Sequence, residues 1–196
     1  MKNIILEPWV GENYANGVEG KKILALGDSL YGDEGNSSYK LVEHFITYKN
    51  GDTGHMNWMN TYTRFTNVIL GEKADKKKTI DFWNSIVFYN YVQHTQIGNR
   101  KAPPDEDYLN SHEAFTEALE EFQPDLIFVW GWGLWSKITR YGVEADFNIL
   151  ENRELKFYYF ESKGKKIPAF GHPHPSTPIF NIKDWTPYLQ AAIKKA

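Results

Sequence analysis

Several polar side chains able to take part in catalysis each follow closely on a short apolar run of the sequence: Asp28, Ser29, Asn90, His172, His174 and Ser176. A carboxylate can stabilise a cation or accept a proton, and a serine hydroxyl can act as a nucleophile. An amide or a histidine can donate a hydrogen bond to negative charge that develops on a leaving group. The two histidines also have a spacing that permits a metal, but no third ligand accompanies them, so we expect no metal site.

The apolar runs that precede these side chains have the character of buried parallel strands. Three of them, at residues 23–26, 126–130 and 167–170, show no polar alternation and are bounded by turn residues. The fourth candidate, at residues 85–89, is rich in β-branched and aromatic residues and is closed by Asn90. In a parallel sheet, ligands bind outside the carboxyl ends of the strands. We therefore expect the acid, the amide and the histidines to converge on that edge of the sheet, which we call the carboxyl rim.

Helical patterns lie between the predicted strands. Residues 57–70, 113–122 and 185–195 carry apolar side chains at helical spacing. Residues 31–55 and 93–112 are polar and interrupted by glycine or proline, which predicts loops. Alternating strands and helices predict a single α/β domain over residues 1–196, built as a three-layer α/β/α sandwich around a mainly parallel four-stranded sheet.

The composition excludes several kinds of protein. The chain of 196 residues has no cysteine, which rules out disulfides, thiolate metal sites and a cysteine nucleophile, and we expect no cofactor. No apolar stretch reaches the roughly 20 residues that cross a bilayer, and the amino-terminal apolar run is too short for a signal peptide. We therefore expect a cytoplasmic protein without membrane contact. A net charge of −3 does not favour general nucleic-acid binding, which would depend on local basic segments such as 73–78, 100–101 and 163–166.

The first of the predicted strand ends resembles a known esterase motif. Gly27-Asp28-Ser29-Leu30 matches the signature of the GDSL esterase family, in which Ser29 would be the nucleophile and a histidine, oriented by a carboxylate, its base. The other motifs of that family are missing. No Gly-x-Asn-Asp block follows a later strand, and no aspartate stands three residues before His172 or His174. An esterase that uses Ser29 is therefore the alternative hypothesis.

A second resemblance uses most of the chain, residues 22–195. Residues 88–106 resemble the part of the iron–sulfur (family 4) uracil-DNA glycosylases in which an Asn-Val-Val segment leads into a Gly-Asn-Arg, proline-rich turn. His174-Pro175-Ser176 matches the His-Pro-Ser motif of the uracil-DNA glycosylase superfamily. The first superfamily motif, Gly-Glu-Ala-Pro-Gly or Gly-Gln-Asp-Pro-Tyr-His, falls on residues 27–32.

The resemblance implies a DNA glycosylase, which flips a base out of DNA and hydrolyses its N-glycosidic bond. Positive charge then builds on the sugar and negative charge on the departing base. Asp28 would stabilise the sugar cation, Asn90 would read the pyrimidine edge, and His174 would donate to the departing O2. DNA is the expected partner, and no protein partner is evident. Further contacts to the DNA are expected from Gly27, Ser29, Tyr31, Tyr39, His172, Ser176 and Arg100.

Four of these further residues have particular expected roles. Tyr39 follows the first motif at about the distance of the superfamily's base-stacking aromatic residue. Tyr31 matches a tyrosine that crowds out a 5-methyl group. Ser176 would hold a phosphate, and His172 would be a second hydrogen-bond donor.

The chain departs from the family at three points. It lacks the cluster cysteines, Leu30 replaces the proline of the first motif, and Ser29 stands where the best-known family has its essential aspartate. A remodelled pocket suits enzymes for other bases, including hypermodified phage cytosines, whereas a methyl-excluding Tyr31 opposes this. Uracil and a modified pyrimidine therefore both remain open, and a non-catalytic nucleic-acid-binding relative is a further hypothesis.

Overall fold

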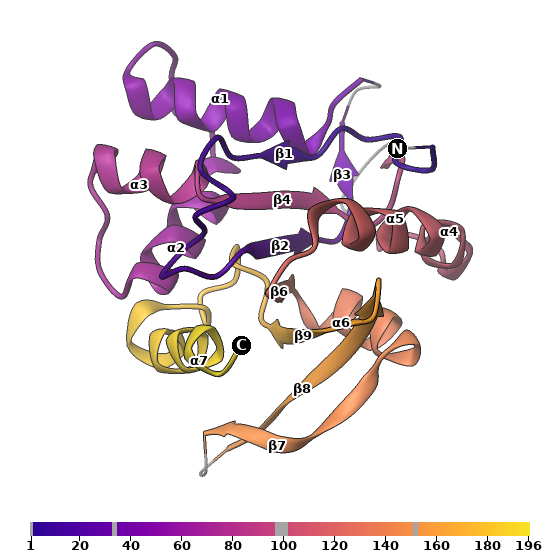
Figure 1. Cartoon of the computed structure of the whole chain (residues 1–196). Coiled ribbons are helices and arrows are strands. Elements are labelled where there is room, and N and C mark those ends of the chain that lie inside the picture. The colour runs from indigo at the N-terminus through magenta and orange to yellow at the C-terminus, as the bar shows by residue number, and fades with distance from the viewer. Residues whose placement is uncertain (1, 33–34, 97–101, 151–152) are drawn as a thin grey trace.

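A computed structural model gives the fold (Figure 1) and describes residues 2–32, 35–96, 102–150 and 153–196, with only the backbone of 146–150 and 153–156. In chain order the elements are β1 (Trp9–Val10), β2 (Ile23–Gly27), β3 (Leu30–Tyr31), α1 (Ser38–Asn50), α2 (Met59–Leu70), α3 (Lys76–Trp83), β4 (Ile86–Asn90), β5 (Thr95–Gln96), α4 (Asp105–Asn110), α5 (His112–Phe122), β6 (Leu126–Trp130), α6 (Trp132–Ile138), η1 (Thr139–Tyr141), β7 (Val143–Leu150), β8 (Arg153–Ser162), β9 (Lys165–His172) and α7 (Ile182–Lys195).

The main sheet is mixed, with the strand order β1-β4-β2-β6-β9-β8-β7. The four predicted strands are β4, β2, β6 and β9, and each runs parallel to its neighbours within this group. The expectation of a four-stranded sheet is wrong, because β1 adds to one edge and β8 and β7 to the other, all antiparallel. A tight turn with positive φ at Lys163 and Gly164 folds β8 back onto β9 as a hairpin, which extends the sheet beyond the parallel strands.

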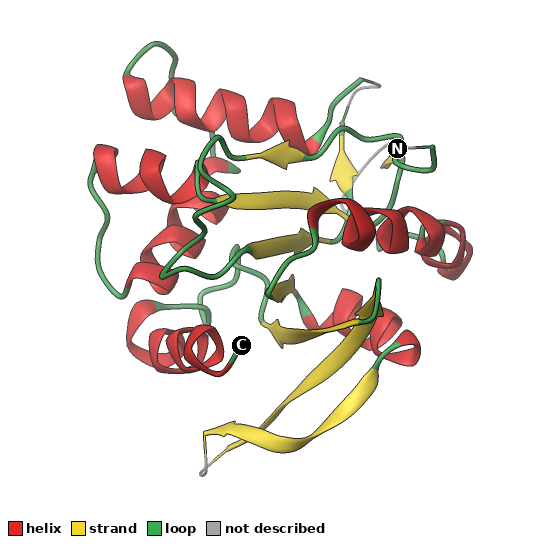
Figure 2. Cartoon of the chain, in the orientation of Figure 1, coloured by secondary structure: helices red, strands yellow, loops and turns green. Residues whose placement is uncertain are grey.

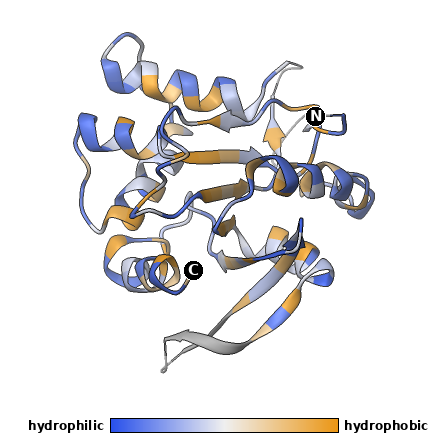
Figure 3. Ribbon diagram, viewed as in Figure 1, coloured by the Kyte–Doolittle hydropathy of each residue, from blue (hydrophilic) through white to orange (hydrophobic). Residues whose placement is uncertain are grey.

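Helices cover both faces of the parallel strands (Figure 2). One apolar core joins the sheet to α1, α2, α3 and α7, and a second joins it to α4, α5 and α6. Every residue of β2, β4 and β6 is buried, and Figure 3 shows β2 and β4 as hydrophobic strands between more polar helices. Burial on both faces explains why these strands read as unbroken apolar runs.

Residues 31–55 are not a loop as expected, because they contain helix α1. The Ser37 side chain caps the helix by accepting a hydrogen bond from the Lys40 N–H at 3.2 Å, and Gly51 ends it with a φ of 93°. Only Ser38, Val42 and Phe45 are buried, and this narrow stripe explains why the helix is hard to recognise among polar residues. Residues 93–112 likewise contain the short strand β5 and helix α4.

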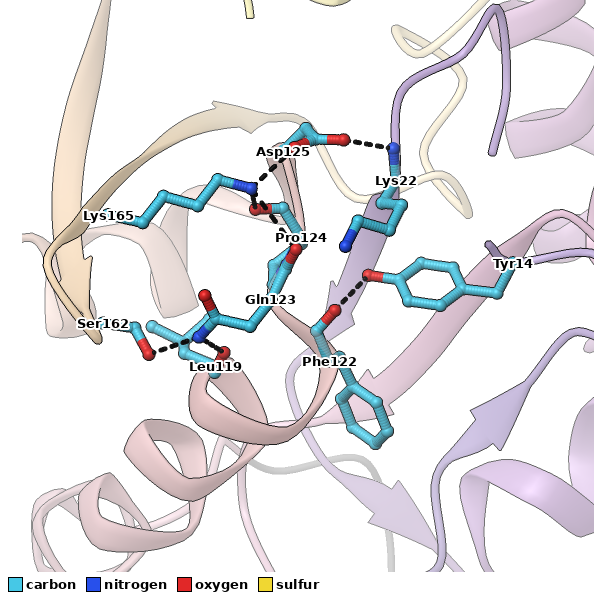
Figure 4. Close-up of polar contacts among 9 residues, drawn as sticks. All are labelled: Tyr14, Lys22, Leu119, Phe122, Gln123, Pro124, Asp125, Ser162 and Lys165. Atoms are coloured by element: carbon cyan, nitrogen blue, oxygen red, sulfur yellow. Dashed lines mark hydrogen bonds and ion pairs between the residues drawn. The ribbon is translucent and has the colours of Figure 1, made fainter. Parts of the chain in front are cut away.

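The amino ends of three parallel strands are tied together by one carboxylate (Figure 4). Asp125, just before β6, accepts a hydrogen bond from the Lys22 N–H at 2.8 Å, next to the start of β2. Its other oxygen pairs with Lys165 Nζ at 2.6 Å, at the start of β9. Lys165 Nζ also donates to the Pro124 carbonyl at 2.8 Å. These contacts fix the strands relative to one another and so help to set the level at which their carboxyl ends finish.

Candidate active site at the carboxyl rim

The carboxyl ends of the parallel strands lie level with one another. Gly27 at the end of β2 stands opposite Asn90 at the end of β4, and Trp130 at the end of β6 stands opposite His172 at the end of β9. The alignment continues past the strands, because the Tyr91 N–H donates to the Gly27 carbonyl at 2.9 Å. The polar residues that the sequence places at the four strand ends therefore share one edge of the sheet.

Gly27 lets the Asn90 side chain lie directly over the end of β2. A Cβ atom at position 27 would stand only 2.5 Å from Asn90 Oδ1, so a side chain here would displace the amide. Asn90 is 3% exposed, and its Nδ2 donates to Ser38 Oγ at 2.9 Å. The backbone N–H of Asn90 donates to the same hydroxyl at 3.1 Å. Ser38 thus positions Asn90 from the first turn of α1, a role that a predicted loop could not suggest.

Asp28 lies on the other side of the sheet from Asn90, because successive residues of a strand point to opposite faces. Its carboxylate faces Tyr108 of α4, and burial raises its pKa while hydrogen bonding from the Tyr108 hydroxyl acts in the opposite direction. Burial and the neighbouring Asp28 raise the pKa of Tyr108, so this phenol stays protonated and serves as a donor. A ligand lying across the rim would meet the carboxylate on one side and the amide on the other.

Unpartnered buried polar atoms gather at the same rim. Within the described residues, five buried side-chain atoms have no hydrogen-bond partner: Asp28 Oδ1, Ser29 Oγ, Tyr89 Oη, Trp130 Nε1 and His172 Nε2. Each belongs to a residue within two positions of the carboxyl end of β2, β4, β6 or β9. Native proteins bury few such atoms, and a cluster of them calls for an explanation. The concentration at one edge marks it as a place where a ligand can complete the hydrogen bonding.

His174 has a defined tautomer. The Ser176 backbone N–H donates to His174 Nδ1 at 3.1 Å, and the Ser176 hydroxyl lies 2.7 Å from the same nitrogen. A backbone N–H can only donate, so Nδ1 is the acceptor and the proton of the neutral ring resides on Nε2. The ring meets Trp130 edge-on, with centroids 5.9 Å apart. His174 therefore offers an Nε2–H donor beside the end of β6.

Arg64 of α2 holds the turn that carries His174, a contact for which the sequence gives no signal. Its Nη1 donates to the Pro175 carbonyl at 3.1 Å and to the Thr177 carbonyl at 2.8 Å. The Thr177 hydroxyl donates to the His174 carbonyl at 2.7 Å and closes the turn from within. Because α2 holds the turn from outside, the histidine ring is placed by the fold and not by its own segment alone.

His172 lies in the aromatic core and not on the surface of the rim. It is fully buried, and its ring stacks on Phe180 with centroids 4.7 Å apart and on Phe65 at 5.9 Å. Nδ1 lies 2.8 Å from the Pro173 carbonyl, which can only accept, so the proton of the neutral ring is on Nδ1. Burial lowers the pKa of His172 to about 3, and the ring therefore stays neutral. Nε2 is an acceptor in this tautomer, which differs from the donor role expected from the sequence.

The other expected site residues are spread around the rim. Tyr39 packs its ring on Trp9 at 5.7 Å and donates its hydroxyl to Glu43 at 2.9 Å, so it serves the contact of α1 with β1. Tyr31 is exposed on β3, which pairs with β5. Ser176 is exposed, and its hydroxyl lies 2.7 Å from His174 Nδ1. Arg100 lies outside the described residues.

Searches of known protein families and of curated proteins returned no match to this sequence. In the described part of the chain, no helix is both long enough and apolar enough to cross a membrane. Among the same residues, no three histidine, aspartate or glutamate side chains are grouped so as to hold a metal ion.

Proposed function

We propose that this chain is a DNA glycosylase that removes uracil or a modified pyrimidine flipped out of DNA. The observation that carries the proposal is the set of unpartnered buried polar atoms at the carboxyl rim, with the Asp28 carboxylate among them. Leaving one such atom unpaired costs roughly 1–3 kcal/mol, so the two that belong to half-buried residues of the rim, Asp28 Oδ1 and Ser29 Oγ, favour a ligand with hydrogen-bonding groups. A flipped nucleotide is a ligand of that kind.

Asp28 is the group suited to the sugar. In the hydrolysis, the oxygen of a water molecule bonds to C1′ and the C1′–N bond breaks. The bonding electron pair leaves with the base, and the proton released from the water neutralises it. A carboxylate removed from bulk water stabilises the cationic sugar more strongly than an exposed one. Because the ionised form does this, base release should fall as the pH drops through the raised pKa of Asp28.

Asn90 and His174 are the groups suited to the base. Asn90 has both a carbonyl oxygen and amide hydrogens, which can match the edge of a pyrimidine. His174 has its proton on Nε2 and can donate to O2 as negative charge develops there. Strand β6 separates β2 from β9, which puts the axes of these two strands roughly 10 Å apart at the usual strand spacing. The end of β6, with Trp130 beside His174, therefore lies between Asp28 and His174.

The same geometry offers little to an esterase that uses Ser29. A serine nucleophile needs a base within hydrogen-bonding reach of its hydroxyl. Among the described residues, the buried Ser29 Oγ has no such partner, and both histidines at the end of β9 have one ring nitrogen engaged elsewhere. The parallel strands with polar carboxyl ends support instead the resemblance to the uracil-DNA glycosylase superfamily.

The test is a panel of oligonucleotides that carry uracil, mismatched thymine or modified cytosines, heated in alkali after incubation with the protein. We expect breakage at the site of one of these bases. Asp28→Asn should abolish base release, because the side chain keeps its shape and loses its charge, whereas the neighbouring Ser29→Ala should retain much of it. Tyr108→Phe should give an intermediate rate, because it removes the phenol that orients Asp28.

Two other outcomes would contradict the proposal. Retention of the oligonucleotides in a gel shift without breakage of any of them would indicate a non-catalytic binder. Turnover of a short-chain chromogenic ester that is lost in Ser29→Ala but kept in Asp28→Asn would indicate the esterase.

A further inference from the structure

A second surface feature lies beside the turn that carries His174. It is a groove with a volume of about 510 Å³ between the carboxyl-terminal half of α2 and the segment that leads into α7. The two helices are joined by a hydrogen bond from Thr186 Oγ1 to the Val68 carbonyl at 2.8 Å. Residues lining the groove include Arg64, Asn67, Lys73, Pro178, Ile182 and Lys183, and we call it the basic groove.

The charge of the basic groove is one-sided. Three cationic side chains line it, and no carboxylate is among its lining residues. Lys73 and Lys183 form no ion pair within the described residues, whereas the neighbouring Glu72 is paired with Lys78 at 2.6 Å. Asp184, which is not among the lining residues, keeps its negative charge because, within the described part of the chain, its carboxylate accepts a hydrogen bond only from the neutral Asn181 amide, at 2.8 Å. It therefore offsets one of the three cations. A local cluster of cations on a chain with a net charge of −3 creates a positive field that attracts an anion.

The walls of the groove place a second requirement on its ligand, which must also present apolar surface. Pro178 and Ile182 give it apolar surface next to the cations. A small inorganic anion would use only the charges, whereas a nucleotide unit presents both a phosphate and the apolar faces of a base and sugar. The combination of cations and apolar walls therefore fits a phosphorylated nucleotide unit better than an isolated anion.

Arg64 connects the groove with the carboxyl rim. It lines the groove and also donates to the carbonyls of Pro175 and Thr177, in the turn that follows His174. Only a few residues separate His174 from the wall of the groove at Pro178. A strand that delivers one nucleotide to the rim would therefore pass close to the groove with its neighbouring nucleotides.

We propose that the basic groove binds a phosphorylated nucleotide unit of the DNA strand whose target base enters the carboxyl rim. The inference rests on the proposed function for the identity of the strand, but the groove itself can be tested by binding alone. A free nucleotide presents the same chemistry, so the experiment must separate these two sources.

The test uses the double variant Lys73→Ala/Lys183→Ala and the charge-matched control Lys21→Ala/Lys194→Ala. The control lysines lie just before β2 and at the carboxyl end of α7, outside the basic segments, whereas the groove is lined by the residues that lead into α7. Binding of a fluorescein-labelled single-stranded oligothymidylate is measured by anisotropy from about 50 to 200 mM salt. Loss of two phosphate contacts should lower the slope of log K against log salt by about 1.4, at about 0.7 per contact. The control should keep the slope of the unmodified protein.

Each outcome bears on the groove separately from the glycosylase. A reduced slope in the groove variant supports the groove even if no base is released from any oligonucleotide, in which case the proposed function alone fails. An unchanged slope, or no binding of the oligonucleotide by the unmodified protein, overturns the groove. The proposal is also overturned if thymidine monophosphate binds in the groove of the unmodified protein and the oligonucleotide does not. The ligand of the groove would then be a free nucleotide.

Discussion

Replacing the buried His172 by phenylalanine is expected to remove part of the protein's sensitivity to acid. Burial between aromatic rings lowers the pKa of His172 to about 3 in the folded chain, from an ordinary value of about 6.5 in the unfolded chain. Below pH of about 6.5 the unfolded state therefore binds a proton that the folded state does not. The stability that His172 contributes is present above that pH and is lost as the pH falls toward 3.

The size of the effect follows from the two pKa values. Between them, each pH unit lowers the free energy of unfolding by about 1.4 kcal/mol. Relative to neutral pH, His172 alone should destabilise the protein by about 1 kcal/mol at about pH 5.5 and by about 3 kcal/mol at about pH 4.5. The phenylalanine variant should show neither loss. At neutral pH the variant removes the unpartnered Nε2 and keeps the stacking on Phe180, but it also loses the hydrogen bond from Nδ1 to the Pro173 carbonyl. The expected difference therefore lies in the change in stability with pH and not in its value at neutral pH.

The assay is urea unfolding followed by tryptophan fluorescence at the three pH values, with free energies extrapolated to zero urea. His55→Gln is the control, because it removes an exposed histidine and leaves the core intact. The reasoning would be refuted if the free energy of unfolding fell with pH equally in the unmodified protein and in His172→Phe. His172 would then take up its proton without unfolding of the chain.

Three further results are expected. Asp28→Asn should raise the urea midpoint at neutral pH. The pKa of Asp28 is raised in the folded chain, so the folded state loses stability as the pH rises through that pKa and the carboxyl group ionises. Asparagine stays neutral and avoids this loss. Gly27→Ala should lower the free energy of unfolding by about 1–3 kcal/mol, because the new Cβ would meet Asn90 Oδ1. Gly133→Ala is the matched control: open space surrounds this position in α6, so the free energy of unfolding should stay unchanged or rise. Urea unfolding measures both. Asp125→Ala should lower the free energy of unfolding by about 2 kcal/mol in the same assay, because it leaves Lys165 and the Lys22 N–H without their carboxylate; no loss would show that the strand starts are held by other contacts.

The strands that form the rim were predictable because they are buried on both faces. The predicted run 126–130 coincides with β6, and the runs 23–26 and 85–89 differ from β2 and β4 by one residue at their ends. Such strands show as unbroken apolar segments whatever lies around them. Their carboxyl ends, and with them Asp28, Asn90 and His174, could be assigned to one edge from the sequence alone.

The groups that hold these side chains in place were not predictable. Ser38 lies in a helix with a narrow apolar stripe, and Tyr108 lies in a six-residue helix within a segment predicted to be a loop. Arg64 contacts the turn after His174 only because α2 and α7 pack together. Each of these contacts joins residues that are far apart in the chain, and no local pattern records a contact of that kind.

The order of the strands in the sheet determines when the candidate site can form during synthesis. β2 comes early in the chain but lies inside the sheet, between β4 and β6, and β9 completes the parallel group much later. Pairings between such distant segments form slowly compared with local ones. A ribosome-bound fragment that ends before β9 has Asp28 and Asn90 but not His174. The growing chain therefore acquires a complete rim only after β9 and the turn that follows it have been synthesised.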